Sequence, residues 1–317
     1  MTRLFFSTDV HGSERCFKKF INAGKFYKAD VLIMGGDLTG KLIIPIVKQP
    51  NGKYTAQLLG ENHLLREDEI DNFERRVKSI GFYPFITSQD KMKELQNDPK
   101  KVDDLFKRLI CNSIEEWINF AEERLRNTGI KCFISAGNDD APYVEEILKK
   151  LESDYVINPE GKVVYIDDNH EMVSIGYSNI TPWKCPRDIP EESLYKKIEN
   201  AVSQVKNMSN CIFNFHCPPV NTSIDQAPKL DEELKPVLQP GGKPEMISAG
   251  CVSVRKAIEK YQPLLGLHGH IHESKGFCKI GRTFCINPGS EYSEGILRGF
   301  LAKITDKGLG DYMFTTG

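Results

Sequence analysis

The sequence of 317 residues has no long apolar run, no C-x-x-C pair and no large excess of either charge. A helix that crosses a membrane needs roughly 20 consecutive apolar residues, so we expect no membrane partner. The 42 Lys and Arg residues nearly balance the 44 Asp and Glu residues, which gives a formal charge of −2. Because this balance provides no general field for holding polyanions, we expect no long nucleic acid among the partners.

The nine cysteines are odd in number, and several stand in strand-like runs such as Lys131-Cys132-Phe133-Ile134. This distribution fits buried, reduced thiols better than a disulfide framework or a zinc knuckle. The apolar run after Met1-Thr2-Arg3 is too short for a signal peptide. We therefore expect a cytoplasmic protein.

Strand-like and helix-like segments alternate along most of the chain. Residues 3–8 and 29–34 are short apolar runs that flank a helix capped by Ser13, a βαβ pattern that predicts a parallel strand pair. Segments 42–47 and 54–59 flank Asn51-Gly52 and predict a hairpin. Further strands are predicted at 130–136, 163–167, 172–177, 211–215, 263–267, 276–280, 283–286 and 300–304, with helices at 142–151, 190–206 and 252–260. The predicted fold class is α/β, with two sheets packed together and helices outside.

Residues 61–127 differ from this pattern because they are highly charged and show few strand signals. Apolar residues recur at helical spacing between Leu105 and Leu125. We predict a helical insertion at about 61–127. Its apolar stripe fits either a cap over one end of the sheet or a helix packed on its own domain.

Polar clusters follow five of the predicted strands. They are Asp9-Val10-His11, Gly35-Gly36-Asp37, Gly137-Asn138-Asp139-Asp140, His216-Cys217-Pro218-Pro219 and His268-Gly269-His270-Ile271-His272. Ligand sites of open α/β sheets lie at the carboxyl ends of strands. The clusters offer carboxylate, amide and imidazole donors without thiolate, a set that suits Mn, Fe, Zn or Co better than Ca or Mg. Seven of these donors exceed the needs of one ion and divide between two if a carboxylate bridges them. They are Asp9, His11, Asp37, Asn138, His216, His270 and His272.

The order D-x-H, G-D, G-N-x, a later His and G-H-x-H resembles the calcineurin-like metallophosphoesterase family. Asn287-Pro288-Gly289-Ser290 also resembles members of this family. The resemblance implies a single domain over residues 1–317, built as a four-layer α/β/β/α sandwich of two mixed sheets. It also implies a centre of two divalent ions (Mn, Fe, Zn, Ni or Co) and a bridging hydroxide as nucleophile. Carried over by position, one ion is held by Asp9, His11 and His272, the other by Asn138, His216 and His270, and both by Asp37.

Asp139 departs from the family pattern, which often has His directly after the G-N pair. An ionised Asp cannot donate a proton, so Asp139 is a candidate catalytic acid only if its pKa is raised. Otherwise it orients a ligand or caps the helix that begins at Pro142. Weak protonation of the leaving group favours hydrolysis of a small phosphodiester. The alternatives are a phosphomonoesterase with the same ligands, a catalytically weak scaffold of this fold, and a nuclease for short oligonucleotides or cyclic nucleotides.

Three further histidines lie outside the predicted ligand set. We expect His268 either to orient a ligand through a hydrogen bond or simply to end its strand. His63 and His170 are expected at the surface, and Cys217 as a small buried residue.

Overall fold

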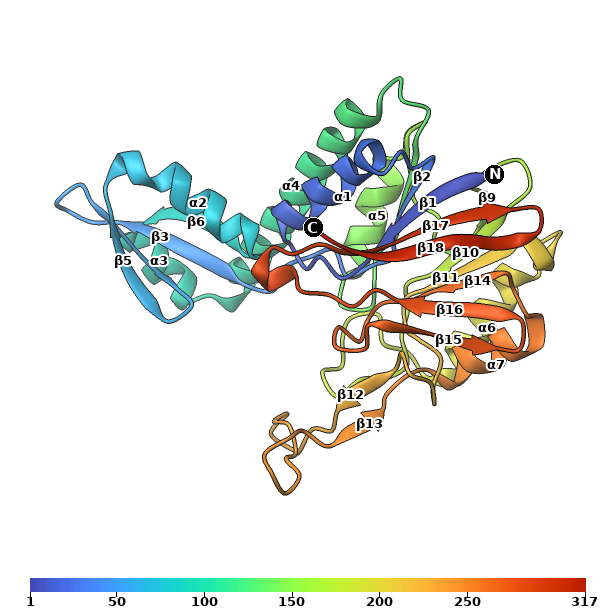
Figure 1. Ribbon diagram of the computed structural model, residues 1–317. Coiled ribbons are helices and arrows are strands. Elements are labelled where there is room, and N and C mark those ends of the chain that lie inside the picture. Colours follow the sequence, from blue (N-terminus) through green and yellow to red (C-terminus); the bar gives the residue numbers. More distant parts are fainter.

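The computed structural model describes residues 1–317 and contains two six-stranded mixed sheets (Figure 1). The first sheet has the order β18-β17-β1-β2-β7-β8, with β1 (Thr2–Ser7), β2 (Val31–Met34), β7 (Lys131–Ile134), β8 (Val156–Ile157), β17 (Arg298–Thr305) and β18 (Gly308–Thr316). The second has the order β15-β16-β14-β11-β10-β9, with β9 (Val163–Tyr165), β10 (Glu171–Ile175), β11 (Cys211–Phe215), β14 (Leu265–Leu267), β15 (Gly276–Ile280) and β16 (Thr283–Asn287). Four adjacent strands of each sheet run parallel. In the first sheet they are β1, β2, β7 and the edge strand β8, with antiparallel β17 and β18 on the other side. In the second sheet antiparallel β15 and β9 form both edges. The predicted α/β class with mixed sheets is confirmed.

The central strands are apolar along their whole length because both of their faces are covered. In β1, Leu4 and Phe6 join a buried cluster that also contains Ile212 and Leu267 of the second sheet. Phe5, whose side chain points to the opposite face, joins a separate cluster with helices of the first sheet. The two sheets therefore pack face to face, and each has helices on its other face.

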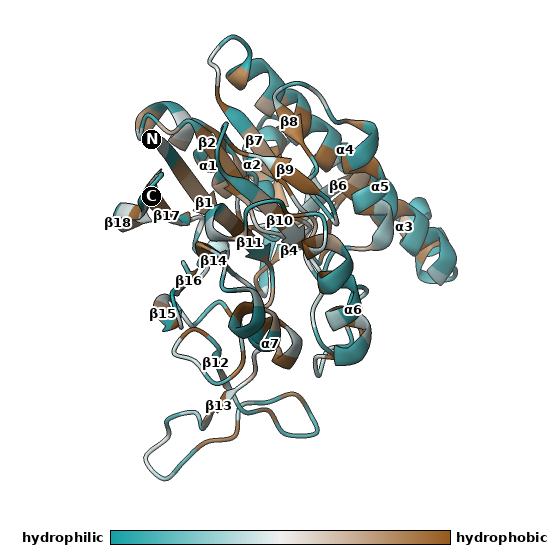
Figure 2. Cartoon of the chain, turned by 90° about the vertical axis from the view of Figure 1, so that its right-hand side faces the viewer, coloured by the Kyte–Doolittle hydropathy of each residue, from teal (hydrophilic) through white to brown (hydrophobic).

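The outer helices belong to the sheet whose face they cover. The first sheet packs against α1 (Glu14–Phe26), α4 (Pro99–Leu125) and α5 (Pro142–Lys150), and the second against α6 (Glu191–Val202) and α7 (Val252–Tyr261). Ser13 caps α1 by accepting a hydrogen bond from Cys16 N, as its position before the helix predicts. Figure 2 shows hydrophobic residues on the strands and hydrophilic ones on the outer helix faces. We refer to the two sheets and these five helices as the body.

A smaller unit, which we call the inserted lobe (residues 43–96), projects from the body at one side (Figure 1). It consists of β3 (Ile43–Lys48), β4 (Tyr54–Leu58), β5 (Glu61–Leu65), the 3-10 turn η1 (Glu67–Glu69), α2 (Ile70–Ser79), β6 (Tyr83–Ser88) and α3 (Gln89–Gln96). The sheet order is β5-β4-β3-β6, and β3 and β4 form the predicted hairpin. The prediction of a helical insertion at 61–127 was wrong in part, since β5 and β6 lie within it. Both strands are only partly buried and are flanked by charged segments, so they lack the continuous apolar run of a central strand.

The remaining segments are short. A two-stranded ribbon of β12 (Gln226–Pro228) and β13 (Met246–Ser248) extends from the body, and 3-10 turns lie at η2 (Met208–Asn210) and η3 (Tyr292–Glu294). All nine cysteines are free thiols, and Cys217 is buried as expected. No helix combines the length and apolar character that a membrane crossing requires.

The expectation that His63 and His170 lie at the surface was wrong. His170 is buried, and its Nδ1 lies 2.8 Å from a carboxylate oxygen of Asp167. His63 is partly buried in the inserted lobe, where its ring centroid lies 5.0 Å from that of Phe73. His170 is therefore held within the turn between β9 and β10, and His63 is covered by Phe73 of α2.

Candidate metal centre

The five polar clusters lie where their strands end, as predicted. Asp9 follows β1, Asp37 follows β2, Asn138 follows β7, His216 follows β11, and His270 and His272 follow β14. The first three strands belong to the first sheet and the last two to the second. Because the sheets pack face to face, loops from both meet at one edge of the body.

Four of the seven predicted ligands have left-handed backbone conformations that residues with a side chain rarely adopt. The φ angle is 53° at Asp9, 38° at His11, 51° at Asp37 and 68° at His270. Such conformations cost of order 1–3 kcal/mol each and occur mainly at functional sites. Hydrogen bonds between loops hold them: His11 N donates to Asp37 O at 2.9 Å, and His270 N donates to Asp9 Oδ2 at 3.0 Å.

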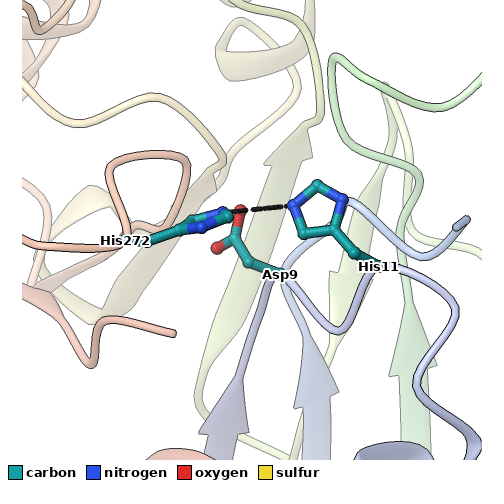
Figure 3. A group of neighbouring side chains, drawn as sticks. All are labelled: Asp9, His11 and His272. Carbon is teal, nitrogen blue, oxygen red and sulfur yellow. Dashed lines mark hydrogen bonds and ion pairs between the residues drawn. The ribbon is translucent and has the colours of Figure 1, made fainter. Parts of the chain in front are cut away.

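One group of donors consists of Asp9, His11 and His272 (Figure 3). The Nε2 atoms of the two histidines are 3.1 Å apart, and His272 Nε2 is 3.4 Å from Asp9 Oδ1. Asp9 and His11 are buried, whereas 30% of the His272 side chain is exposed. The group is therefore open to solvent on the His272 side.

A second group consists of Asp37, His216 and His270. Asp37 lies between the groups, with Oδ1 at 3.4 Å from His216 Nε2 and Oδ2 at 3.5 Å from His11 Nε2. The two oxygens of one carboxylate thus face different sets of histidines.

Asn138 adjoins the second group. Its Oδ1 lies 2.9 Å from His270 Nδ1, and its Nδ2 donates to Asp188 Oδ1 at 2.8 Å. Asp188 also accepts from Thr181 N and Cys185 N, which fixes the carboxylate and hence the direction of the Asn138 amide. The structure therefore brings all seven predicted ligands together, and Asp188 is a supporting residue that no motif indicated.

Burial and neighbouring histidines set the protonation of the two carboxylates. Burial alone raises the pKa of Asp9, but His216 and His272 outweigh it and lower the pKa to about 2. Burial also raises the pKa of Asp37, but His216 and His11 outweigh this effect and hold the pKa well below its usual range. Both carboxylates are ionised at neutral pH.

The imidazoles respond in different ways. Burial lowers the pKa of His11 and of His270 to about 4, so both rings are neutral near pH 7. Burial also disfavours a charge on His216, but Asp37 and Asp9 raise its pKa to about 10. The centre of the cluster therefore favours a positive charge next to His216 Nε2.

Asp140 is a second carboxylate that the motifs did not assign. It is fully buried and accepts hydrogen bonds from Leu38 N, Thr39 N and Gly137 N at 2.8–3.1 Å. Burial and the nearby Asp37 raise its pKa to about 6. These bonds join the loop after β2 to the loop after β7, so Asp140 fixes the separation of two loops that carry ligands.

Asp139 lies at the open side of the cluster, with 21% of its side chain exposed. Its backbone N donates to Asp37 Oδ1 at 3.0 Å, and its Oδ2 is 2.6 Å from Lys41 Nζ and 3.7 Å from His11 Nδ1. Lys41 was not predicted as a site residue, because it stands four positions beyond Asp37 and outside the motif. Asp139 does not cap α5, whose N-cap is Ala141.

His268 faces away from both donor groups. Its Nδ1 lies 2.7 Å from Phe215 O, and its ring is fully buried. Burial lowers the pKa of His268 to about 4. It contacts the strand that carries His216, and it is not part of either donor group.

The donor set fits divalent metal ions, which the resemblance implies. The buried His216 Nε2 has no hydrogen-bond partner, while its Nδ1 lies 3.0 Å from Gly35 O. Metal-bound histidines typically donate their second ring N–H to a carbonyl or carboxylate in this way. A cation at His216 Nε2 would also supply the positive charge that Asp9 and Asp37 favour.

Comparison with known proteins gives a likeness in fold. A scan against protein-family models finds no match. Uncharacterized protein MJ1162 of Methanocaldococcus jannaschii is 36% identical over 154 residues, which are 48% of this chain and 61% of that protein. The chain therefore matches less than two thirds of that relative.

Two solved structures match over nearly the whole chain. The crystal structure of TT1561 from Thermus thermophilus has a TM-score of 0.54 at 13% identity. The match covers 100% of this chain and 98% of the TT1561 chain. Another crystal structure has a TM-score of 0.59 at 15% identity, with 99% and 98% covered. At these identities the likeness establishes the fold alone. The clustered His and Asp side chains are those of the sequence motifs that resemble the calcineurin-like metallophosphoesterases.

Proposed function

We propose that this protein is a metal-dependent phosphoesterase that hydrolyses small phosphodiesters. The observation that carries the proposal is the position of Asp37, whose two oxygens face two separate sets of histidines at 3.4 and 3.5 Å. A carboxylate in this position is suited to bridge two cations. Asp9, His11 and His272 would hold one ion, and Asn138, His216 and His270 the other.

Two divalent ions, when bound, neutralise charge on phosphoryl oxygens and lower the pKa of bound water. The chain supplies the surroundings for this chemistry. Neutral His11 and His270 offer lone pairs at neutral pH, and the ionised Asp9 and Asp37 balance the cationic charge. The partly exposed His272 and Asp139 mark the side from which an ester can approach.

The groups near the opening favour a diester over a monoester. A cavity of about 370 Å³ adjoins His272 and contains Lys275 and Arg298, which could meet a terminal phosphate. Glu273 and Glu291 line the same cavity, and Glu291 is ion-paired to Arg298. The two carboxylates offset the two cations, so the cavity offers no excess positive charge for the dianion of a monoester. A phosphomonoesterase is therefore the second candidate.

The proposal includes residues 1–317 as one domain, with the inserted lobe as an addition to it. Gly81 of the lobe lies against the loop that carries His11, since a Cβ at Gly81 would meet His11 O at 2.2 Å. The lobe is thus fixed to the site loop. A capping role for it remains part of the proposal.

The test is hydrolysis of bis-p-nitrophenyl phosphate and p-nitrophenyl phosphate by metal-stripped protein, with Mn, Ni, Zn or Mg added back. We expect metal-dependent turnover, faster with the diester. Faster turnover of the monoester would select the second candidate. Bound metal without turnover of either ester would contradict both and favour a catalytically weak scaffold.

A further inference from the structure

Lys41 stands at the opening of the cluster, at the start of the inserted lobe. It follows Gly40, whose N donates to the Tyr83 hydroxyl at 2.9 Å, so the backbone before it is fixed. Its side chain is 56% exposed, and its Nζ lies 2.6 Å from Asp139 Oδ2. The ammonium is therefore held on one side by Asp139, while its other side faces solvent.

Asp139 connects this ammonium to the predicted ligands. Its Oδ2 also lies 3.7 Å from His11 Nδ1, and its backbone N donates to Asp37 Oδ1. The carboxylate thus occupies a position between Lys41 and the His11 ring. Without Lys41, its negative charge would face an incoming phosphate.

Of the other cations near the site, Arg187 and Arg298 have ion pairs of their own, whereas Lys275 lines the cavity beside His272 and has none. Arg187 is buried, with ion pairs to Glu145 at 3.1 Å and to Glu160 at 3.3 Å. Arg298 pairs with Glu291 in the cavity that adjoins His272. Asp139 forms a third group of potential donors with His11 and Asp37, and Lys41 is the one Lys or Arg that is ion-paired to a member of these groups.

The ammonium retains capacity for a further ligand. A lysine carries three N–H donors, and Asp139 is the one carboxylate that is ion-paired with it here. Tyr292 borders the same opening, because its ring centroid lies 4.7 Å from that of His11. A phosphoryl group beside the donor groups would therefore meet a partly free ammonium.

We propose that Lys41 is the phosphate-binding residue of this site and that Asp139 is a positioning residue for Lys41. This inference rests on the proposed function. It assigns the pair the task of steadying the phosphate, at the position where the family often has a single His. Asp139 then needs no proton of its own, because it directs the ammonium and offsets part of its charge.

The experiment measures binding of inorganic phosphate to Mn-loaded protein by isothermal titration calorimetry, with metal content measured by mass spectrometry. The variants are Lys41→Met, which keeps the aliphatic stem, and Lys41→Arg, which keeps the charge. Lys196→Met is the matched control, because Lys196 also pairs with a carboxylate, Glu192 at 2.8 Å, on an exposed face of α6.

We expect Lys41→Met to weaken phosphate binding by about tenfold or more, as a lost charged hydrogen bond implies. Lys41→Arg should stay within about threefold of wild type, and Lys196→Met should not differ from it. Metal content should be unchanged in all three. A Lys41→Met protein that binds phosphate like the control, or that loses metal, would overturn the inference.

The role of Asp139 is tested by Asp139→Asn in two backgrounds. In Lys41→Met protein, the substitution removes only a repulsive charge and should tighten phosphate binding. In wild type, it also releases the ammonium, so binding should tighten less or weaken. Equal effects in both backgrounds would contradict a positioning role.

This design separates failure of the inference from failure of the proposed function. Phosphate binding that depends on Lys41, in a protein that hydrolyses no ester, would support the inference and contradict the phosphoesterase. A Lys41→Met protein that hydrolyses esters with unchanged KM and binds phosphate as wild type does would support the phosphoesterase and contradict the inference.

Discussion

The body and the inserted lobe differ in the size of their buried apolar cores and in what those cores support. The body contains three buried apolar clusters of 25, 17 and 15 residues, whereas the lobe has one of nine. All nine residues of the lobe cluster come from the lobe itself. The groups of potential metal donors all lie in the body. The large core therefore holds strained, charged loops in place, while the lobe needs only to maintain its own shape.

The comparison also shows where left-handed backbone can be tolerated. Asp9, His11, Asp37 and His270 lie on loops whose strands are buried on both faces. Conformations that cost of order 1–3 kcal/mol each persist only where surrounding structure imposes them. The lobe has one such residue other than glycine, Leu59 with φ 52°, and it lies in the tight, exposed turn between β4 and β5, whose hairpin geometry requires it.

The largest effect is expected for Asp37→Asn in the body. The substitution removes the charge between the two donor groups, so both metals should bind weakly. We expect metal content to fall and turnover to drop by on the order of a hundredfold or more. Asp168→Asn, the same change at an exposed residue, is the control. Full activity and full metal content in Asp37→Asn would contradict the model of two ions joined by one carboxylate.

Removal of metal should affect the body more than the lobe. At a free metal concentration of 100 times Kd, binding contributes about 2.7 kcal/mol, so chelation should lower Tm by roughly 5 °C. Hydrogen exchange should then rise in the loops after β1, β2 and β11 and stay constant in β4 and β5. Equal changes in both regions would show that the lobe depends on the centre as much as the body does.

A matched pair of core substitutions sharpens the comparison. Ile212 and Ile46 are both fully buried, the first between the two sheets and the second in the lobe. Replacing either by Ala should cost about 2–5 kcal/mol of stability. Only Ile212→Ala should also weaken metal binding, because β11 leads directly into His216. Calorimetric metal titration of both variants checks this, and equal losses of affinity would contradict the separation of roles.

The sequence allowed prediction of the body better than of the lobe for a physical reason. Strands covered on both faces are continuous apolar runs, and the donors that follow them stand next to glycines in recognisable motifs. Strands β5 and β6 of the lobe are partly exposed, so they show no continuous apolar run and are hidden among the charged helical segments around them. Lys41 and Asp188 were missed because their roles depend on long-range contacts. Lys41 pairs with Asp139, 98 positions later, and Asp188 accepts from Asn138, 50 positions earlier. Such contacts have no local signal.

The smallest effect is expected for His63→Ala in the lobe. His63 is the lobe's single histidine, with 19% of its side chain exposed and Nε2 at 3.9 Å from Glu61. Its ring packs on Phe73, so its loss should cost about 1 kcal/mol or less. Metal content and turnover should stay at wild-type levels, because no donor group includes it. A fall in turnover of more than about threefold, with Tm unchanged, would show that the lobe takes part in the chemistry and that the division between the two regions is wrong.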